Sequence, residues 1–290
     1  MNIIRTITEL QQITTNLKQS KKSIGFVATM GYLHEGHETL MTAARDENDI
    51  VIASIFVNPL QFGPTEDFDS YPRDEERDIS IAKKAGVDLL FIPEVEEMYP
   101  QKGLIEMKIT ERVNVLCGRS RPGHFDGVIT VLTKLFHIVQ ADRTYFGLKD
   151  AQQVAVVDAL ITYFNFPVQL VGIPTIRESD GLAKSSRNIR LSVSEREEAK
   201  SLYQAIQRGQ NLIVDGEDNP AMIVKEVKSI LENKTSGKID YVELLSYPEL
   251  HQVDDTNQQL ILAVAVQFNE ARLIDNLIID SEGNIINQFI

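Results

Sequence analysis

The chain has 290 residues, of which 43% are hydrophobic and 24% are charged, as in a folded globular protein. Its length favours two domains. The formal net charge of -13 disfavours nucleic acid and anionic membranes as partners, and the single cysteine, Cys117, excludes internal disulfides and thiolate-rich metal clusters.

The first residues, MNIIRTITELQQITTNLKQSKK, lack the basic-then-apolar order of a secretion signal. No apolar run in the sequence approaches the roughly 20 residues that a membrane-spanning helix needs. We therefore expect a cytoplasmic protein that does not interact with membranes.

From Ser23 to about Pro174, short runs rich in β-branched residues alternate with amphipathic stretches. The predicted strands are IGFVAT (24–29), IVIASIFV (50–57), DLLFIP (88–93), RTYFG (143–147) and VQLVGIP (168–174). Helical periodicity lies between them, at about 36–47, 72–86, 126–139 and 151–165. This alternation predicts an α/β domain with a doubly wound, parallel, Rossmann-like sheet.

The pattern changes after RESDGLAKSSRN (177–188). Two amphipathic helices are predicted near 194–213 and 219–233, followed by three strands in YVELLSY, QLILAVAVQF and ARLIDNLII. A tight turn is expected at Asn269 and Glu270. We predict a nucleotide- and substrate-binding domain over residues 1–178 and a smaller α+β domain over 179–290 that covers the active site.

The most informative segment is IGFVATMGYLHEGHETL (24–40), in which a strand runs into Gly31, a short turn and a helix that begins near Gly36. A helix N-terminus presents unpaired N–H groups and a positive dipole end, and the two glycines allow a phosphate to approach the backbone. His34 and His37 are three residues apart, so both imidazoles project to the same side and can donate to phosphate oxygens.

Two other interpretations of this histidine pair stay open, a structural pair and a metal-binding pair. The metal interpretation is weaker because the remaining histidines, His124, His137 and His251, show no ligand spacing with the pair. The strand immediately upstream favours phosphate.

Several motifs together resemble one family. MGYLHEGH (30–37) resembles the HxGH element of the nucleotidyltransferase superfamily and, within it, the pantoate–β-alanine ligases. Further motifs similar to those of the family follow in its order: FVNPLQFGPTEDFDSYPR (56–73), CGRSRPGHFDGV (117–128), YFGLKDAQQ (145–153), GLAKSSRN (181–188) and LAVAVQFNEARLIDN (262–276).

The resemblance implies an AMP-forming ligase that joins pantoate and β-alanine through a pantoyl adenylate. It also implies ATP as a substrate, Mg²⁺ bound with ATP, and a homodimer; no protein ligand of the metal is assigned. A second class of enzyme stays open, a nucleotidyltransferase that adenylylates a phosphate or alcohol acceptor and retains the nucleotide in its product. A third is a nucleotide-binding regulator without turnover.

The resemblance also implies roles for individual residues, with His37, His34, Lys149 and Arg187 as the catalytic set and His37 as the first choice of proton donor. The implied ATP site comprises Met30, Gly31, Tyr32, Leu33, His34, Glu35, Gly36, His37, Gly147, Leu148, Lys149, Asp150, Ile176, Lys184, Ser185, Ser186 and Arg187. Gln61 and Gln153 are implied to bind pantoate, with Gln61 close to β-alanine as well. An amide both donates and accepts, which suits a substrate with hydroxyls and a carboxylate. From the residues alone, however, a capping or solvent-facing role for each glutamine is as well supported as substrate binding.

Two residues depart from the family pattern: Lys184 stands where methionine is usual, and Tyr32 where alanine is common.

The acidic stretch PTEDFDSYPRDEERD (64–78) precedes a predicted helix, where capping is a better interpretation than metal binding. Because an acyl adenylate is sensitive to water, we expect the second domain or the loop at 62–70 to close over it.

Overall fold

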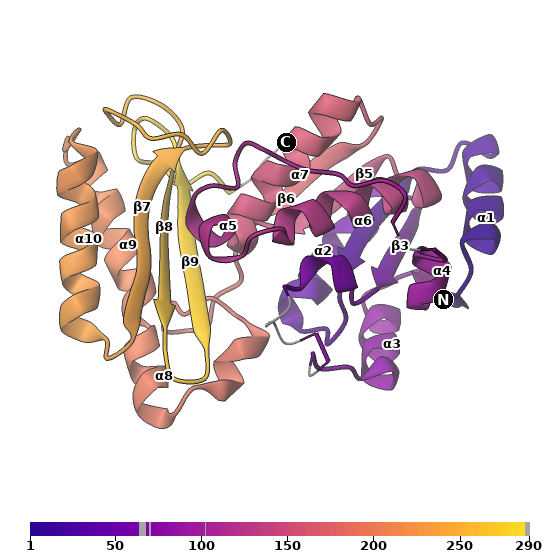
Figure 1. Ribbon diagram of the computed structural model, residues 1–290, viewed down its shortest axis with the longest axis horizontal. Coiled ribbons are helices and arrows are strands. Elements are labelled where there is room, and N and C mark those ends of the chain that lie inside the picture. The colour runs from indigo at the N-terminus through magenta and orange to yellow at the C-terminus, as the bar shows by residue number, and fades with distance from the viewer. Residues whose placement is uncertain (64–67, 70, 102, 288–290) are drawn as a thin grey trace. The chain divides into compact units, whose positions relative to one another are not determined.

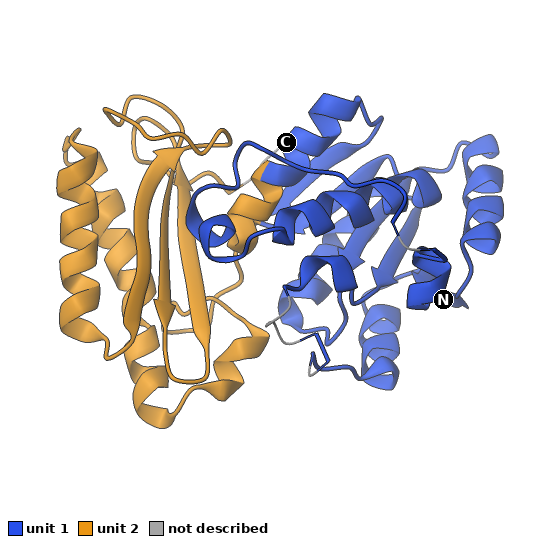
Figure 2. Cartoon of the chain, viewed as in Figure 1, with its two compact units in different colours: residues 1–147, 156–173, 289–290 blue, residues 148–155, 174–288 orange. Residues whose placement is uncertain are grey.

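The computed structural model describes residues 1–63, 68, 69, 71–101 and 103–287. The chain divides into two compact units (Figure 2). Among the described residues, unit 1 contains Met1–Gly147 and Val156–Ile173, and unit 2 contains Leu148–Ala155 and residues 174–287. None of the helices in the described part of the chain is long and apolar enough to cross a membrane.

The sheet of unit 1 has six parallel strands in the order β1-β4-β3-β2-β5-β6. The strands are β1 (Asn2–Ile4), β2 (Ile24–Thr29), β3 (Ile50–Ile55), β4 (Leu89–Phe91), β5 (Arg143–Gly147) and β6 (Gln169–Ile173). The predicted doubly wound parallel sheet is therefore confirmed. The strand order reverses between β2 and β5, which pair side by side, and open α/β sheets bind ligands beyond the carboxyl ends of the strands at such a point.

Along the chain, helices connect the successive strands of unit 1 (Figure 1). They are α1 (Ile7–Gln19), α2 (Glu35–Glu47), α3 (Glu75–Lys84), α4 (Val95–Met98), α5 (Leu116–Ser120), α6 (His124–Val139) and the 3-10 turn η1 (Pro59–Gln61). Helix α7 (Ala151–Phe164) contains the division between the units. The four helices predicted for this region are present as α2, α3, α6 and α7.

Side chains of the sheet and of helices α2 and α3 form one hydrophobic core of unit 1. It includes Val27, Leu40, Met41, Ala44, Val51, Ala53, Ala82 and Leu90. This core fixes the helix starts to the strand ends, so the turns that follow β2 and β3 have rigid supports on both sides.

Unit 2 contains a separate antiparallel sheet in the order β7-β8-β9. The elements of unit 2 are η2 (Leu148–Asp150), η3 (Ser186–Arg190), α8 (Val193–Ala199), α9 (Ser201–Val214), α10 (Pro220–Lys234), β7 (Lys238–Ser246), β8 (Leu260–Gln267) and β9 (Arg272–Ile279). Helices α9 and α10 lie along the sheet and share its hydrophobic core (Figure 1). The expected turn at Asn269 and Glu270 is present, closed by a 2.9 Å bond from Phe268 N to Ala271 O.

The sequence predicted one helix over 194–213, and this is wrong in detail because α8 ends at Ala199 and α9 begins at Ser201. At the break, Ser201 Oγ donates to the Glu198 carbonyl at 2.6 Å. A side-chain hydroxyl that bonds a nearby carbonyl competes with the helical ladder at that position.

Candidate active site

The HxGH segment forms a tight turn between β2 and α2. Gly31 and Tyr32 adopt left-handed backbone conformations, with φ of 82° and 49°. A Cβ on Gly31 would also lie 2.9 Å from Asp78 Oδ2, so backbone conformation and space both require glycine there. The turn delivers the chain to His34, the N-cap of α2, and so places the helix N-terminus just beyond the end of β2.

The two histidines form reciprocal caps at this helix start. His34 Nδ1 accepts from Gly36 N at 3.1 Å, and His37 Nδ1 accepts from His34 N at 3.2 Å. Because each Nδ1 is an acceptor, the neutral ring carries its proton on Nε2. The ring centroids are 4.1 Å apart. The backbone thus orients two neighbouring imidazoles as Nε2–H donors.

A buried carboxylate accepts hydrogen bonds from the backbone of this turn. Asp78 of α3 is 1% exposed, and its two oxygens accept from Tyr32 N at 2.8 Å and Leu33 N at 2.6 Å. Burial raises the pKa of Asp78, while these two N–H groups oppose that rise. The guanidinium carbon of Arg77 lies 4.9 Å from the centre of the Tyr32 ring, which gives this departure from the family pattern a structural contact.

Gln61 ends η1 and is 7% exposed. Asn58 Nδ2 donates to Gln61 Oε1 at 3.1 Å and to the Gly127 carbonyl at 3.0 Å. Asn58 Oδ1 accepts from Leu60 N at 3.3 Å and from the Tyr99 hydroxyl at 2.9 Å, which fixes the Asn58 amide in one orientation. The oxygen of Gln61 is therefore engaged, and its NH₂ group is the donor that a ligand would meet.

The segment after β5 belongs to unit 2. Leu148, Lys149 and Asp150 form η2, and α7 follows directly at Ala151, so the predicted pair Lys149 and Asp150 does lie at a helix start. The Lys149 ammonium lies 3.7 Å from Asp150 Oδ1, and the Lys149 side chain is 20% exposed. Gln153 is half-buried in the first turn of α7.

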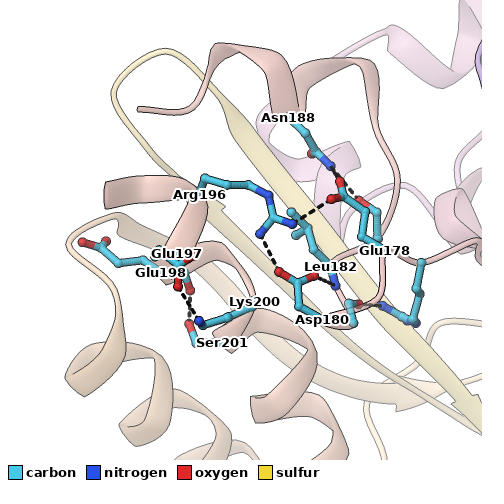
Figure 3. Close-up of polar contacts among 12 residues, drawn as sticks. Glu178, Asp180, Leu182, Asn188, Arg196, Glu197, Glu198, Lys200 and Ser201 are labelled. Carbon is cyan, nitrogen blue, oxygen red and sulfur yellow. Dashed lines mark hydrogen bonds and ion pairs between the residues drawn. The ribbon is translucent and has the colours of Figure 1, made fainter. Parts of the chain in front are cut away.

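The basic segment 177–188 forms an ordered, hydrogen-bonded turn. Lys184 N donates to Ile176 O at 2.9 Å and Glu178 N to Leu182 O at 2.8 Å, closing a short antiparallel loop. Arg196 of α8 bonds Glu178 Oε2 and Asp180 Oδ2, each at 2.7 Å (Figure 3). The Arg196 guanidinium lowers the pKa of Asp180.

The end of this segment begins a 3-10 turn. Ser185 is the N-cap of η3, and its hydroxyl oxygen accepts from Arg187 N at 3.2 Å. Because the oxygen accepts, the hydroxyl hydrogen remains a donor. Ser185 and Ser186 are half-buried, whereas Arg187 is exposed.

The acidic stretch lies only partly within the described residues, because 64–67 and 70 are outside them. Asp74 is the N-cap of α3 and accepts from Arg77 N at 3.1 Å, so the capping interpretation is confirmed for this residue. Nowhere in the described ranges do three or more His, Cys, Asp or Glu side chains form a group that could hold a metal ion. The expected closure of the loop at 62–70 concerns a segment of which residues 64–67 and 70 lie outside the described part of the chain, so it stays a prediction.

The sequence did not identify Asp78, Asn58, Tyr99 or His124 as part of this region. His124 donates from Nδ1 to the Gln61 carbonyl, with the two atoms 2.9 Å apart. Asn58 followed by Pro59 was the one local signal, since asparagine before proline is typical of a turn. Asp78 and Tyr99 gave none, because their partners are distant in the sequence.

The parallel sheet, its switch point and the two-histidine turn define a nucleotide-binding α/β protein of the HxGH type. The family model described as Pantoate-beta-alanine ligase matches residues 2–278. The chain therefore belongs to the pantoate–β-alanine ligase family.

Individual relatives agree with this assignment. The chain is 59% identical to a pantothenate synthetase of Geobacillus sp. (strain WCH70) over 276 residues, covering 94% of this chain and 98% of that protein. The crystal structure of pantothenate synthetase from Thermus thermophilus superposes with a TM-score of 0.89 at 44% identity, covering 96% and 99%. The pantoate–β-alanine ligase of Francisella tularensis, complexed with Beta-gamma ATP and β-alanine, has a TM-score of 0.76 at 34% identity, covering 96% and 97%.

Proposed function

We propose that this protein condenses pantoate with β-alanine to form pantothenate, using ATP and releasing AMP and pyrophosphate. The observation that carries the proposal is that backbone N–H groups bond Nδ1 of both His34 and His37 at the N-terminus of α2, so that each neutral ring carries its donor hydrogen on Nε2. Such preorganised donors stabilise negative charge that develops on phosphate oxygens. The family assignment supports the choice of substrates.

The reaction has two displacements. A pantoate carboxylate oxygen attacks the α-phosphorus of ATP, and the bond to the β-phosphate breaks as pyrophosphate leaves. The β-alanine amine then attacks the pantoyl carbonyl, the acyl–phosphate bond breaks, AMP leaves, and the nitrogen loses its extra proton. Neither step requires a covalent enzyme intermediate, so catalysis rests on positioning and charge stabilisation.

The roles of the side chains follow their chemistry. His34 and His37 donate to ATP phosphates, with His37 the proton donor, and Lys149 and Arg187 offset the charge of the departing pyrophosphate. The hydroxyls of Ser185 and Ser186 donate to the same phosphates. Met30, Gly31, Tyr32, Leu33, Glu35, Gly36, Gly147, Leu148, Asp150, Ile176 and Lys184 complete the proposed ATP contacts.

Gln61 and Gln153 bind pantoate in this proposal. The structure supports an NH₂ donor at Gln61, because Asn58 occupies the amide oxygen. A donor at this position suits a carboxylate or hydroxyl oxygen, both of which pantoate carries. In this proposal Gln61 also lies near β-alanine, and the carboxylate of β-alanine accepts hydrogen bonds in the same way.

The metal enters as part of the substrate, MgATP. Mg²⁺ keeps several waters and is commonly held by phosphates with one or two protein carboxylates, so a protein cage is not required. We further propose a cytoplasmic homodimer. The dimer rests on family resemblance, and the location is supported by the use of ATP and by a single cysteine.

The test is to measure AMP and pyrophosphate from MgATP with pantoate and β-alanine added singly and together. Pantothenate and AMP should appear only with both acids present, and labelled pyrophosphate should exchange into ATP with pantoate alone. An enzyme that retains the nucleotide in its product would release pyrophosphate without AMP and without a need for β-alanine. Absence of turnover would leave a nucleotide-binding regulator.

A further inference from the structure

The C-terminal motif LIDN ends in two polar residues on β9, Asp275 and Asn276, and both are buried, at 2% and 7% exposure. Buried polar side chains in a strand need partners. Within unit 2, these two residues find them on two separate segments of chain.

Asn276 holds the segment that follows β5. Its Nδ2 donates to Leu148 O at 3.1 Å and to Lys149 O at 2.8 Å, so one amide group bonds two consecutive carbonyls of η2. The Tyr247 hydroxyl donates to the next carbonyl but one, Ala151 O, at 3.2 Å. These bonds fix the backbone from which the Lys149 side chain extends.

Asp275 holds the basic loop. Arg177 donates to both oxygens of its carboxylate, from Nη1 at 2.7 Å and Nη2 at 2.9 Å. Arg177 Nη1 also donates to Gly181 O at 3.0 Å, and its guanidinium carbon lies 3.8 Å from the centre of the Tyr203 ring. Arg177 is thus a structural cation that ties the loop to the strand, with its charge matched by Asp275.

Two further side chains, those of Arg196 and Asn188, also bond the loop. Arg196 bonds Glu178 and Asp180, and Asn188 Nδ2 bonds Glu178 Oε1 at 3.2 Å and Ala183 O at 3.1 Å (Figure 3). The chain between Arg177 and Asn188 therefore behaves as one unit, and its attachment point on the sheet is Asp275.

Consecutive residues of a strand point to opposite faces of a sheet, so a single dipeptide can hold two different segments. Asp275 and Asn276 pair with Val264 and Ala263 of β8, inside the longest continuous ladder of the small sheet. The two attachment points are therefore fixed relative to each other by the backbone of one strand.

We propose that Asp275 and Asn276 are positioning residues, which hold two proposed ATP-binding segments of unit 2 in place. They hold the segment of Leu148 to Asp150 and the loop of Ile176 to Arg187, both in unit 2, in fixed register with each other. The inference rests on the proposed function, because the phosphate-binding role of both segments belongs to that proposal. Neither Asp275 nor Asn276 contacts substrate in this role; they act through the backbone they hold.

The first experiment replaces Asn276 by leucine, which keeps the branched shape and the number of side-chain heavy atoms and removes both N–H donors. We expect kcat/KM for ATP in pantoate-dependent pyrophosphate exchange to fall between about 10- and 100-fold, as for a displaced catalytic group. KM for β-alanine should stay within about twofold. Asn276→Ser, which keeps one donor, should give an intermediate loss and guards against a leucine variant that does not fold.

The second readout is amide hydrogen exchange, which does not depend on activity. Exchange should become faster over residues 148–152 in Asn276→Leu and over residues 176–184 in Asp275→Asn. Val227→Ala is the matched control, because it opens a cavity in the same core without touching either attachment. It should leave kcat/KM for ATP within about twofold.

Wild-type kcat/KM for ATP in both Asn276 variants would overturn the inference, as would an equal loss in Val227→Ala. If the wild-type protein instead makes no AMP from ATP, pantoate and β-alanine, the proposed function fails. In that case amide hydrogen exchange still decides whether Asp275 and Asn276 hold these segments.

Discussion

At the scale of single residues, the turn that precedes His34, the proposed phosphate-binding turn, depends on Asp78. Its two oxygens satisfy the N–H groups of Tyr32 and Leu33, next to the left-handed residues that aim the chain at His34. A turn that requires φ above zero at Tyr32 is strained for any residue except glycine. The carboxylate therefore stabilises a conformation that Tyr32 would not adopt by itself.

Replacing Asp78 by asparagine should lower kcat/KM for ATP by about 10-fold at neutral pH, because one N–H group then faces an NH₂ group and a buried unpaired donor costs about 1–3 kcal/mol. Steady-state kinetics with varied MgATP measures this. Asp74→Asn on the same helix is the control, since asparagine caps a helix as well as aspartate does. Equal kinetics in the two variants would contradict the role of Asp78.

Asp78 also gives the stability of the wild type a pH dependence that Asp78→Asn lacks. Burial raises the folded-state pKa of Asp78, so its contribution to stability is fully present below the ordinary aspartate pKa and is lost as pH rises through the raised value. The free energy of unfolding of the wild type relative to Asp78→Asn should therefore decrease as pH rises across that window. Urea unfolding of both proteins at several pH values measures this difference, and a difference that grew with pH would have the wrong sign.

At the scale of elements, the position of Gln61 is set by how closely α6 approaches η1. A Cβ on Gly127 would lie 2.1 Å from Leu60 O and 2.7 Å from Gln61 N, which are backbone atoms that have no freedom to rotate away. Glycine in a helix normally destabilises it by roughly 0.5–1 kcal/mol relative to alanine. Glycine is therefore required at position 127 because η1 packs too closely for a side chain, and not because glycine favours a helix.

We therefore expect Gly127→Ala to be destabilising, by about 1–3 kcal/mol as for other overpacked sites, although helix propensity alone predicts the opposite sign. Because the clash displaces Gln61, KM for pantoate should rise at least about fivefold while KM for ATP changes less. Chemical denaturation and steady-state kinetics measure the two effects. Gly103→Ala is the matched control, since its nearest contact would be Ile105 O at 3.7 Å. A Gly127 variant as stable and active as that control would disprove the argument.

At the scale of the whole molecule, local and distant determinants separate what the sequence could predict. The turn at His34 was predictable because strand, glycines, histidines and helix lie within residues 24–40. The residues that hold it were not, because Asp78 is 45 and 46 positions from its partners and Asn276 is 127 and 128 positions from its own. A side chain whose partner is set by the fold carries no periodic or spacing signal.

Two elements at the N-terminus were not predicted either, and for different reasons. The sequence interpretation assigned neither β1 nor α1, although Thr6 followed by Glu9 is a helix-capping pattern and Glu9 N does bond Thr6 Oγ1 at 3.4 Å. Strand β1 has only three residues, and it is stabilised by pairing with β4, which lies far along the chain. Short strands of this kind are determined by their neighbours in the sheet.

The division into two units with separate cores leads to a prediction for the whole molecule. If residues of both units bind MgATP, as proposed, ligand must protect a segment in each. With MgATP and pantoate at about 100 times their dissociation constants, openings that release the nucleotide should become about 100-fold rarer. Hydrogen exchange should therefore slow over residues 31–37 of unit 1 and over residues 184–188 of unit 2, and not at the exposed residues Ser281, Glu282 and Asn284. Protection confined to one unit would show that the other contributes no contact, and would remove its residues from the proposed ATP site.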